Sequence, residues 1–401
     1  MGRLANGLRM VHLHCHSKVA YCGVTVGAGS RNDPDDRHGL AHFVEHTIFK
    51  GTLRRRSWRI ISRMERVGGE ISAYTTKEET VVYSVFPCAY FDRAAELISD
   101  IVINSQFPEN ELAKERDVVL EEVNSYLDTP SEAVYDDFEE MVWRGSALGH
   151  NILGNEAHLL ATTSADCRKH LENLFAPGNM VFFALGPMCP DAVTRLAEKY
   201  FGQLDRPLVR EARVKPAVLP PFHATRDIGS HQAHTIYGVP VFGVHDSRKY
   251  ALSLLNNILG GPGMSSLLNV AIRERRGYVY TIESSLLLLS DCGLFTVYFG
   301  SDCCHVRPSL RIMGNIIDRL ASKPMTQRAL DAAKRQLIGQ WRINDDNHEN
   351  RALAAAKSVL HFGRIDPDEV VVARISDVTP AQVMDAAESI EAQVASTLTL
   401  L

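Results

Sequence analysis

The sequence predicts an α+β protein made of two homologous domains, each a largely antiparallel sheet covered by helices. Three observations lead to this prediction. The chain has 401 residues, 45% hydrophobic and 23% charged, which is long enough for two domains with full cores. The proline-rich segment 206–221 separates two similar halves, so we expect domains at 1–205 and 222–401 joined by this linker. Each half also holds a segment rich in β-branched and aromatic residues, 80–86 and 293–299, which predicts a strand.

The elements of the two halves correspond in order. Each half begins with strands, continues with a helix and a glycine-rich turn, and returns to strands and long helices. The corresponding segments are 8–26 and 234–241 for the first strands, 40–49 and 250–261 for the first helix, and 111–126 and 330–340 for a later helix.

The first helix carries a pattern typical of zinc peptidases. His42, Glu45 and His46 form His-x-x-Glu-His, the reverse of the motif His-Glu-x-x-His. Positions four apart lie on one helix face, so both imidazoles can reach one Zn²⁺, with a carboxylate beside them to take a proton from water. The alternative is a solvated helix face with two histidines. The apolar residues around the motif favour the metal-site interpretation. They indicate a buried helix, and buried ionisable groups need partners or a metal. These flanking residues are Leu40, Ala41, Phe43, Val44, Ile48 and Phe49.

A third ligand is expected on the helix at 111–126, which follows Phe107-Pro108. Glu115 and Glu122 are seven residues apart and share one face of this helix. Glu122 could be the ligand, and Glu115 could orient a ligating histidine. The alternative is a solvated acidic face, and spacing alone does not decide between the two.

These residues resemble the pitrilysin, insulin-degrading enzyme and mitochondrial processing peptidase family, in a short two-domain form of bacterial type. The family pairs His-x-x-Glu-His with a glutamate about as far along the chain as Glu122. The resemblance implies a zinc-dependent endopeptidase with one Zn²⁺ per chain, held by His42, His46 and Glu122, with Glu45 as general base and Glu115 behind a ligating histidine. Further similar segments are 27–33, 49–52, 68–80, 259–266 and 273–280.

The resemblance also implies where a peptide substrate binds. Ser72, Ala73, Tyr74 and Thr75 are similar to the family's substrate-binding strand, although Ser72 stands where the family usually has asparagine. An extended peptide would add to this strand through backbone hydrogen bonds.

Arg273 and Tyr280 are similar to the family's pair that grips the substrate opposite the zinc. Because one chain carries both this pair and the zinc motif, we expect a homodimer whose active sites are completed in trans. A heterodimer with a related chain is the alternative, and so, for function, is a non-catalytic peptide-binding or scaffold subunit.

Composition excludes several other classes. A net charge of −5 gives no indication of nucleic-acid binding. The chain has no apolar run near the roughly 18 residues of a membrane span, and no hydrophobic signal core. Its eight scattered cysteines indicate free thiols, so we expect a cytoplasmic protein. One further pattern, His12, His14 and His16, places three imidazoles on one strand face. This predicts either a second metal site or, more simply, an exposed strand.

Overall fold

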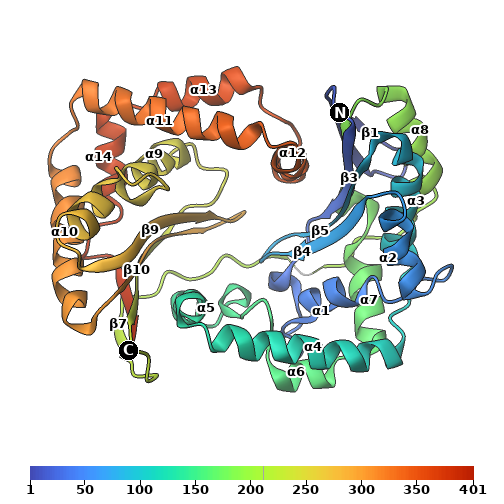
Figure 1. Cartoon of the computed structure of the whole chain (residues 1–401), viewed down its shortest axis with the longest axis horizontal. Coiled ribbons are helices and arrows are strands. Elements are labelled where there is room, and N and C mark those ends of the chain that lie inside the picture. Colours follow the sequence, from blue (N-terminus) through green and yellow to red (C-terminus); the bar gives the residue numbers. More distant parts are fainter. Residues whose placement is uncertain (211) are drawn as a thin grey trace. The chain divides into compact units, whose positions relative to one another are not determined.

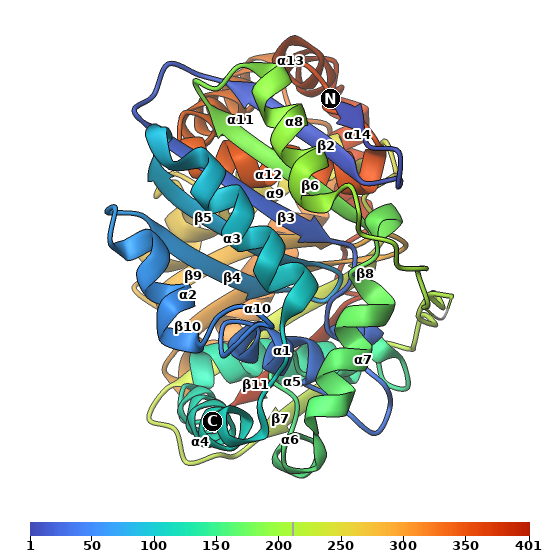
Figure 2. The same ribbon diagram turned by 90° about the vertical axis from the view of Figure 1, so that its right-hand side faces the viewer.

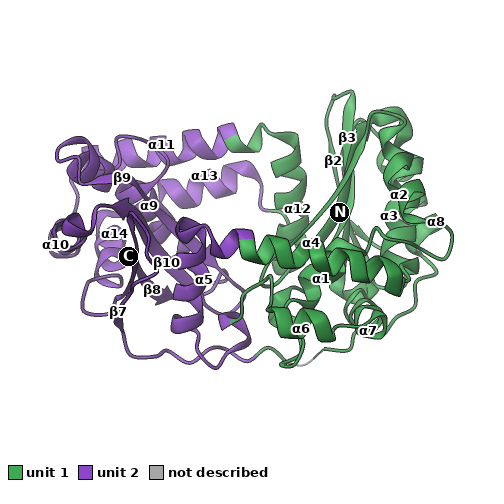
Figure 3. Cartoon of the chain, turned by 60° about the horizontal axis from the view of Figure 1, so that its bottom comes forward, with its two compact units in different colours: residues 1–124, 150–213, 344–365 green, residues 125–149, 214–343, 366–401 purple. Residues whose placement is uncertain are grey.

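The computed structural model describes residues 1–210 and 212–401, which form two compact units (Figures 1 and 3). Each unit contains one sheet and several helices, so the predicted α+β class is confirmed. Residue 211 of the predicted linker lies outside the described residues. Unit 1 comprises residues 1–124, 150–213 and 344–365, and unit 2 comprises residues 125–149, 214–343 and 366–401.

Unit 1 is built on a six-stranded sheet in the order β1-β2-β6-β3-β5-β4. Neighbouring strands are antiparallel except β2 and β6, which are parallel. β4 therefore forms one edge of the sheet, paired on one side only, with β5. The strands are β1 (Gly2–Arg3), β2 (Arg9–His14), β3 (Val19–Val26), β4 (Glu70–Thr75), β5 (Thr80–Pro87) and β6 (Met180–Gly186).

Helices cover both faces of this sheet because alternate residues along a strand point to opposite sides. Met10 and Phe182 pack towards the helices α3 and α8, whereas their neighbours Val11 and Phe183 pack towards α12. Figure 1 shows α12 on one side of the sheet and α3 and α8 on the other, and Figure 2 looks onto α3 and α8 in front of the strands. The helices of unit 1 are α1 (Leu40–Thr47), α2 (Ser57–Glu65), α3 (Phe91–Asn104), α4 (Glu109–Leu127), α6 (Glu156–Ala161), α7 (Ser164–Leu174), α8 (Pro190–Phe201) and α12 (His348–Phe362).

Unit 2 repeats the arrangement with a five-stranded sheet in the order β7-β11-β8-β10-β9. Phe295 and Val297 pack against α9, α10 and α14, while Leu294 and Tyr298 pack on the other face against α5. The strands are β7 (His223–Arg226), β8 (Ala233–Val241), β9 (Val279–Leu288), β10 (Gly293–Ser301) and β11 (Ser396–Leu400). The helices are α5 (Pro130–Val142), α9 (Lys249–Gly260), a π-helix (Asn269–Glu274), α10 (Val306–Ser322), α11 (Gln327–Asp345), α13 (Asp368–Ser376) and α14 (Pro380–Glu388).

Each sheet is covered on one face by a helix from the other half of the sequence. α5 lies before the proline-rich segment 206–221 but packs in unit 2, and α12 lies after it but packs in unit 1. The predicted division at 206–221 follows the repeat in the sequence and stays a prediction. Among the described residues, no helix combines the length and the apolar character that crossing a membrane requires.

Candidate active site

The structure brings His42, His46 and Glu122 together. Both histidines lie on α1 and Glu122 lies on α4, and one potential ligand atom from each comes within 4.8 Å of the other two. The Nε2 atom of His46 is 3.2 Å from one carboxylate oxygen of Glu122, and the Nε2 atom of His42 is 3.8 Å from the other. Two imidazoles and a carboxylate are the ligand set of many catalytic zinc sites.

The start of α1 is fixed by a buried carboxylate and a close backbone contact. Asp33 accepts hydrogen bonds from the main-chain amides of Gly39 and Ala41, each at 2.9 Å, which pairs amides that a helix start leaves free. Burial raises the pKa of Asp33 to about 8, against the opposing effect of these bonds. Gly39 has a φ of 89°, and a Cβ there would lie 2.6 Å from the Leu153 carbonyl oxygen and 2.8 Å from the Gly154 Cα. Only glycine fits this position.

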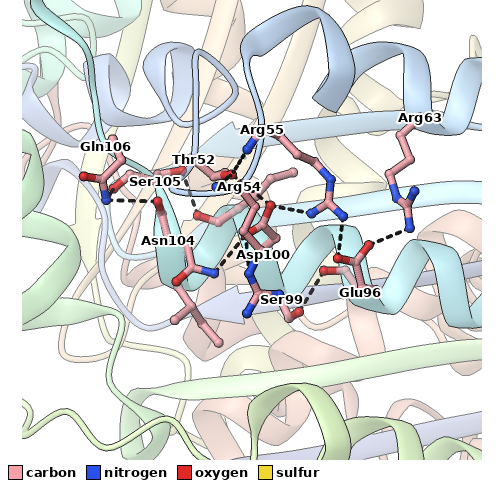
Figure 4. A network of polar contacts seen from close by, with 12 residues as sticks. Thr52, Arg54, Arg55, Arg63, Glu96, Ser99, Asp100, Asn104, Ser105 and Gln106 are labelled. Atoms are coloured by element: carbon pink, nitrogen blue, oxygen red, sulfur yellow. Dashed lines mark hydrogen bonds and ion pairs between the residues drawn. The ribbon is translucent and has the colours of Figure 1, made fainter.

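The segment after α1 is anchored to α3 by a polar network (Figure 4). The Thr52 hydroxyl donates to the Asp100 carboxylate at 2.9 Å, and Arg55 forms ion pairs with Asp100 at 2.5 Å and with Glu96 at 2.6 Å. Arg63 reaches the second oxygen of Glu96 at 2.7 Å. The Asp100 side chain is fully buried, so these partners compensate its charge. They also hold the segment that follows α1 in place.

Burial keeps His42, one of the two candidate ligand histidines on α1, neutral. Burial, followed by the neighbouring His46, lowers the pKa of His42 to about 3. Neutral imidazole is the form that binds a metal. Burial also raises the pKa of Glu45, and Glu122 adds to this effect, while Thr75 and His46 act in the opposite direction. A raised pKa suits a carboxyl group that must first accept a proton and then return it.

Glu115 lies behind His46, on the side away from Glu122. One Glu115 oxygen is 3.2 Å from the Nδ1 atom of His46, and the other is 2.5 Å from the Nζ atom of Lys50. The Nδ1 contact orients the ring so that its Nε2 atom faces Glu122. Lys50 was not among the predicted site residues. It lies three residues beyond the end of α1 at Thr47, so helical spacing gave no signal for it.

A cavity of about 440 Å³ opens beside Glu45 and His46. Its wall combines apolar and acidic side chains, so it could hold a side chain that is apolar along its stem and basic or polar at its tip. The other lining residues are Phe49, Lys50, Ile61, Glu65, Glu70, Ile71 and Glu115.

The predicted substrate strand, Ser72 to Thr75, forms most of the edge strand β4. Its register with β5 pairs Ser72 with Tyr83 and Thr75 with Thr80. Thr75 is also the residue that interacts with Glu45, so the edge of the sheet passes the general-base candidate.

Arg273 and Tyr280 lie in unit 2. Arg273 is on the π-helix and approaches Glu274 at 3.8 Å. Tyr280 is on β9, is 59% exposed, and its hydroxyl donates to Asp302 at 3.3 Å. Asp302 raises the pKa of Tyr280. The roles predicted for both residues stay predictions.

The histidines on β2 and just after it do not form a ligand cluster: His12 is half-buried, whereas His14 and His16 are exposed. His12 and His14 have ring centroids 6.4 Å apart, and His14 and His16 have centroids 5.0 Å apart. Among the described residues, they are not one of the groups whose ligand atoms lie within 4.8 Å of one another.

Comparisons with known proteins agree with these observations. A sequence profile described as insulinase, peptidase family M16, matches residues 9–156, and a profile described as peptidase M16 inactive domain matches residues 162–337. An uncharacterized zinc protease of Bacillus subtilis is 30% identical over 85% of this chain and 83% of its own length. Another, from Streptomyces coelicolor, is 31% identical over 96% of this chain and 86% of its own length.

Two solved structures share the fold. A protease from Helicobacter pylori superposes with a TM-score of 0.92 at 21% identity, covering 100% of this chain and 98% of the other. A peptidase M16 inactive domain from Pseudomonas fluorescens gives a TM-score of 0.92 at 18% identity, covering 100% and 97%.

Proposed function

From its membership of the insulinase-type peptidase family M16, to which this chain belongs, we propose that the protein is a zinc-dependent endopeptidase that hydrolyses extended peptides or unfolded segments. The observation that carries the proposal is the convergence of His42, His46 and Glu122, with Glu45 on the same helix. Relatives named zinc proteases support zinc as the metal.

The three side chains fit one zinc ion. Their donor atoms are two imidazole nitrogens and a carboxylate oxygen, and the low pKa of His42 keeps its nitrogen available. With zinc bound there, the site would supply a water whose pKa is lowered to about 7. We assign one such ion to each chain.

The residues around this site divide the remaining tasks. Glu45 takes the proton of the attacking water and passes it to the leaving amine, a role that its raised pKa supports. Glu115 holds the His46 ring through Nδ1, and Lys50 holds Glu115 in turn.

The substrate adds to the free edge of β4 as a further strand. Main-chain hydrogen bonds along Ser72, Ala73, Tyr74 and Thr75 supply affinity with little demand on sequence. The adjoining cavity receives a side chain next to the scissile bond. Because the cavity is lined by both Ile61 and acidic residues, the proposal favours long side chains with a basic end over acidic ones.

Arg273 and Tyr280 are proposed to complete the site of a second subunit, in a homodimer or in a heterodimer with a related chain. Tyr280 is exposed, and its hydroxyl, which donates to Asp302 at 3.3 Å, would turn to donate to a developing oxyanion. Mixing Glu45→Gln chains with Tyr280→Phe chains tests this assignment. Partial recovery of activity in mixed dimers is expected, and no recovery would contradict completion in trans.

The first experiment measures bound zinc and hydrolysis of an unstructured peptide in wild type, Glu45→Gln and His42→Ala. Wild type should bind zinc and cleave. Glu45→Gln should keep its zinc and lose at least about 100-fold in rate, and His42→Ala should lose both. If zinc binds but wild type is inert on varied peptides, the chain is a peptide-binding or scaffold subunit instead.

All eight cysteines are free, which supports a reducing compartment and hence the cytoplasm.

A further inference from the structure

A second group of metal-ligand side chains lies outside the proposed active site. Asp35, His38 and His150 each offer one ligand atom, and these atoms lie within 4.8 Å of one another. Asp35 and His38 precede α1, and His150 follows the short helix at 147–149. The three residues therefore come from two segments that are more than 100 positions apart in the sequence.

The rings of His38 and His150 are stacked, with centroids 3.4 Å apart and planes inclined by 23°. The Nε2 atom of His38 is buried and has no hydrogen-bond partner in the part of the chain that the structure describes. A buried ring nitrogen without a partner is uncommon because its desolvation is not compensated. A bound cation would compensate it.

His158, on α6, has a different task in the same cluster. The main-chain amide of His38 donates to its Nδ1 atom at 3.0 Å, and its ring meets that of His38 edge-on with centroids 4.7 Å apart. Its Nδ1 lone pair is therefore already used, so His158 supports His38 rather than adding a ligand atom.

We propose that Asp35, His38 and His150 form a second divalent-cation site, separate from the one on α1 and selective for Zn²⁺ or a similar transition metal. Two imidazoles and one carboxylate suit borderline cations, whereas Ca²⁺ and Mg²⁺ prefer oxygen ligands alone. Because Asp35 is exposed and both histidines are half-buried, the site is open to solvent on one side. A bound ion would link the segment before α1 to the segment at 150–154, beside the close contact of Gly39 with Gly154.

The charge state of the cluster is compatible with a cation. Burial, followed by the neighbours His150 and His158, lowers the pKa of His38 to about 4, while Asp35 and Asp36 act in the opposite direction. The His38 ring is thus neutral at pH 7 and carries a lone pair.

The test counts ions in the whole chain at graded free Zn²⁺, by equilibrium dialysis followed by elemental analysis. Wild type should reach about two ions per chain, one for each group of three ligands. His38→Ala and His150→Ala should each reach about one, and the thermal stabilisation of wild type by the second ion should disappear with it. Asp35→Asn alters an exposed side chain, does not threaten folding, and should bind the second ion more weakly.

Three controls distinguish zinc binding at this site from binding at other histidines of the chain. His158→Ala disturbs the same cluster without removing a ligand and should keep the second ion. His14→Ala combined with His16→Ala removes the exposed strand histidines and should also keep it. His42→Ala combined with His46→Ala should lose the other ion only, so failure of the proposed active site would not be mistaken for failure here. The proposal would be overturned if the three ligand variants bind as many ions as wild type does, or if wild type binds a single ion that is lost when His42 and His46 are both replaced by alanine.

Discussion

Substitution of Gly39 by alanine should destabilise the metal-motif helix more than an ordinary glycine replacement does. Gly39 caps α1 with a φ of 89°, in the left-handed region. Its added Cβ would meet the Leu153 carbonyl oxygen at 2.6 Å and the Gly154 Cα and nitrogen at 2.8 and 3.0 Å. All three are main-chain atoms, so no side-chain rotation relieves the contact.

The magnitude has two parts. Holding alanine in the left-handed region costs about 1–2 kcal/mol. Forcing a methyl group against fixed backbone costs about 1–3 kcal/mol more, as for an overpacked core. The sum is about 2–5 kcal/mol. Gly68→Ala is the matched control, because Gly68 lies in the same unit with a φ of 75° and nothing within 4 Å of its added Cβ.

Hydrogen exchange measured by mass spectrometry is the suitable assay, because it reports on α1 separately from the rest of the chain. A loss of about 2–5 kcal/mol lowers the protection of the α1 amides by roughly 30-fold to several thousand-fold. Gly68→Ala adds only the strain of holding alanine in the left-handed region. It should therefore lower hydrogen-exchange protection in unit 1 by about tenfold. Equal effects of the two substitutions on α1 would refute the argument from the backbone contact.

Three further outcomes are expected. Glu115→Gln should weaken zinc binding by about 10–100-fold with little effect on folding, because the charge that orients His46 is lost; unchanged zinc affinity in a competition titration would contradict this. Glu79→Gln should destabilise unit 1 by roughly 2 kcal/mol, because buried Glu79 pairs with His361 at 2.5 Å and Lys357 at 2.8 Å on α12. These partners oppose burial and lower the pKa of Glu79, so this contribution is present above the ordinary value of 4.5 and is lost as pH falls through the lower folded value. A stability difference between wild type and the variant that does not decrease as pH falls below 4.5 would argue against that assignment. Removal of metal by a chelator should abolish peptide hydrolysis, and added Zn²⁺ should restore it; activity that survives exhaustive chelation would exclude a zinc mechanism.

The centre of the candidate site could be predicted because its spacing is local. His42 and His46 share a face of α1 through helical periodicity, and Glu115 and Glu122 share a face of α4 for the same reason. That the two helices face each other was implied by the family resemblance rather than by the spacing. The ion pair of Glu115 with Lys50 depends on that packing and was not foreseen.

The strands were also predictable, with boundaries close to those expected. The segments 80–86 and 293–299 lie within β5 and β10. Helical periodicity identifies a buried face but does not say which sheet it will cover. For that reason the placement of α5 in unit 2 and of α12 in unit 1 could not be obtained from the repeat.

The exchange of α5 and α12 has a consequence for biosynthesis. The strands of the first sheet are complete once residue 186 has been made, yet one face of that sheet awaits residues 348–362. At about 5–20 residues per second, ribosomes need roughly 10–30 s to reach them. During this interval Val11, Phe183 and Leu185 present an uncovered apolar surface. Nascent chains should therefore depend on chaperones until translation is almost finished, and truncation before α12 should yield aggregates instead of a working first unit.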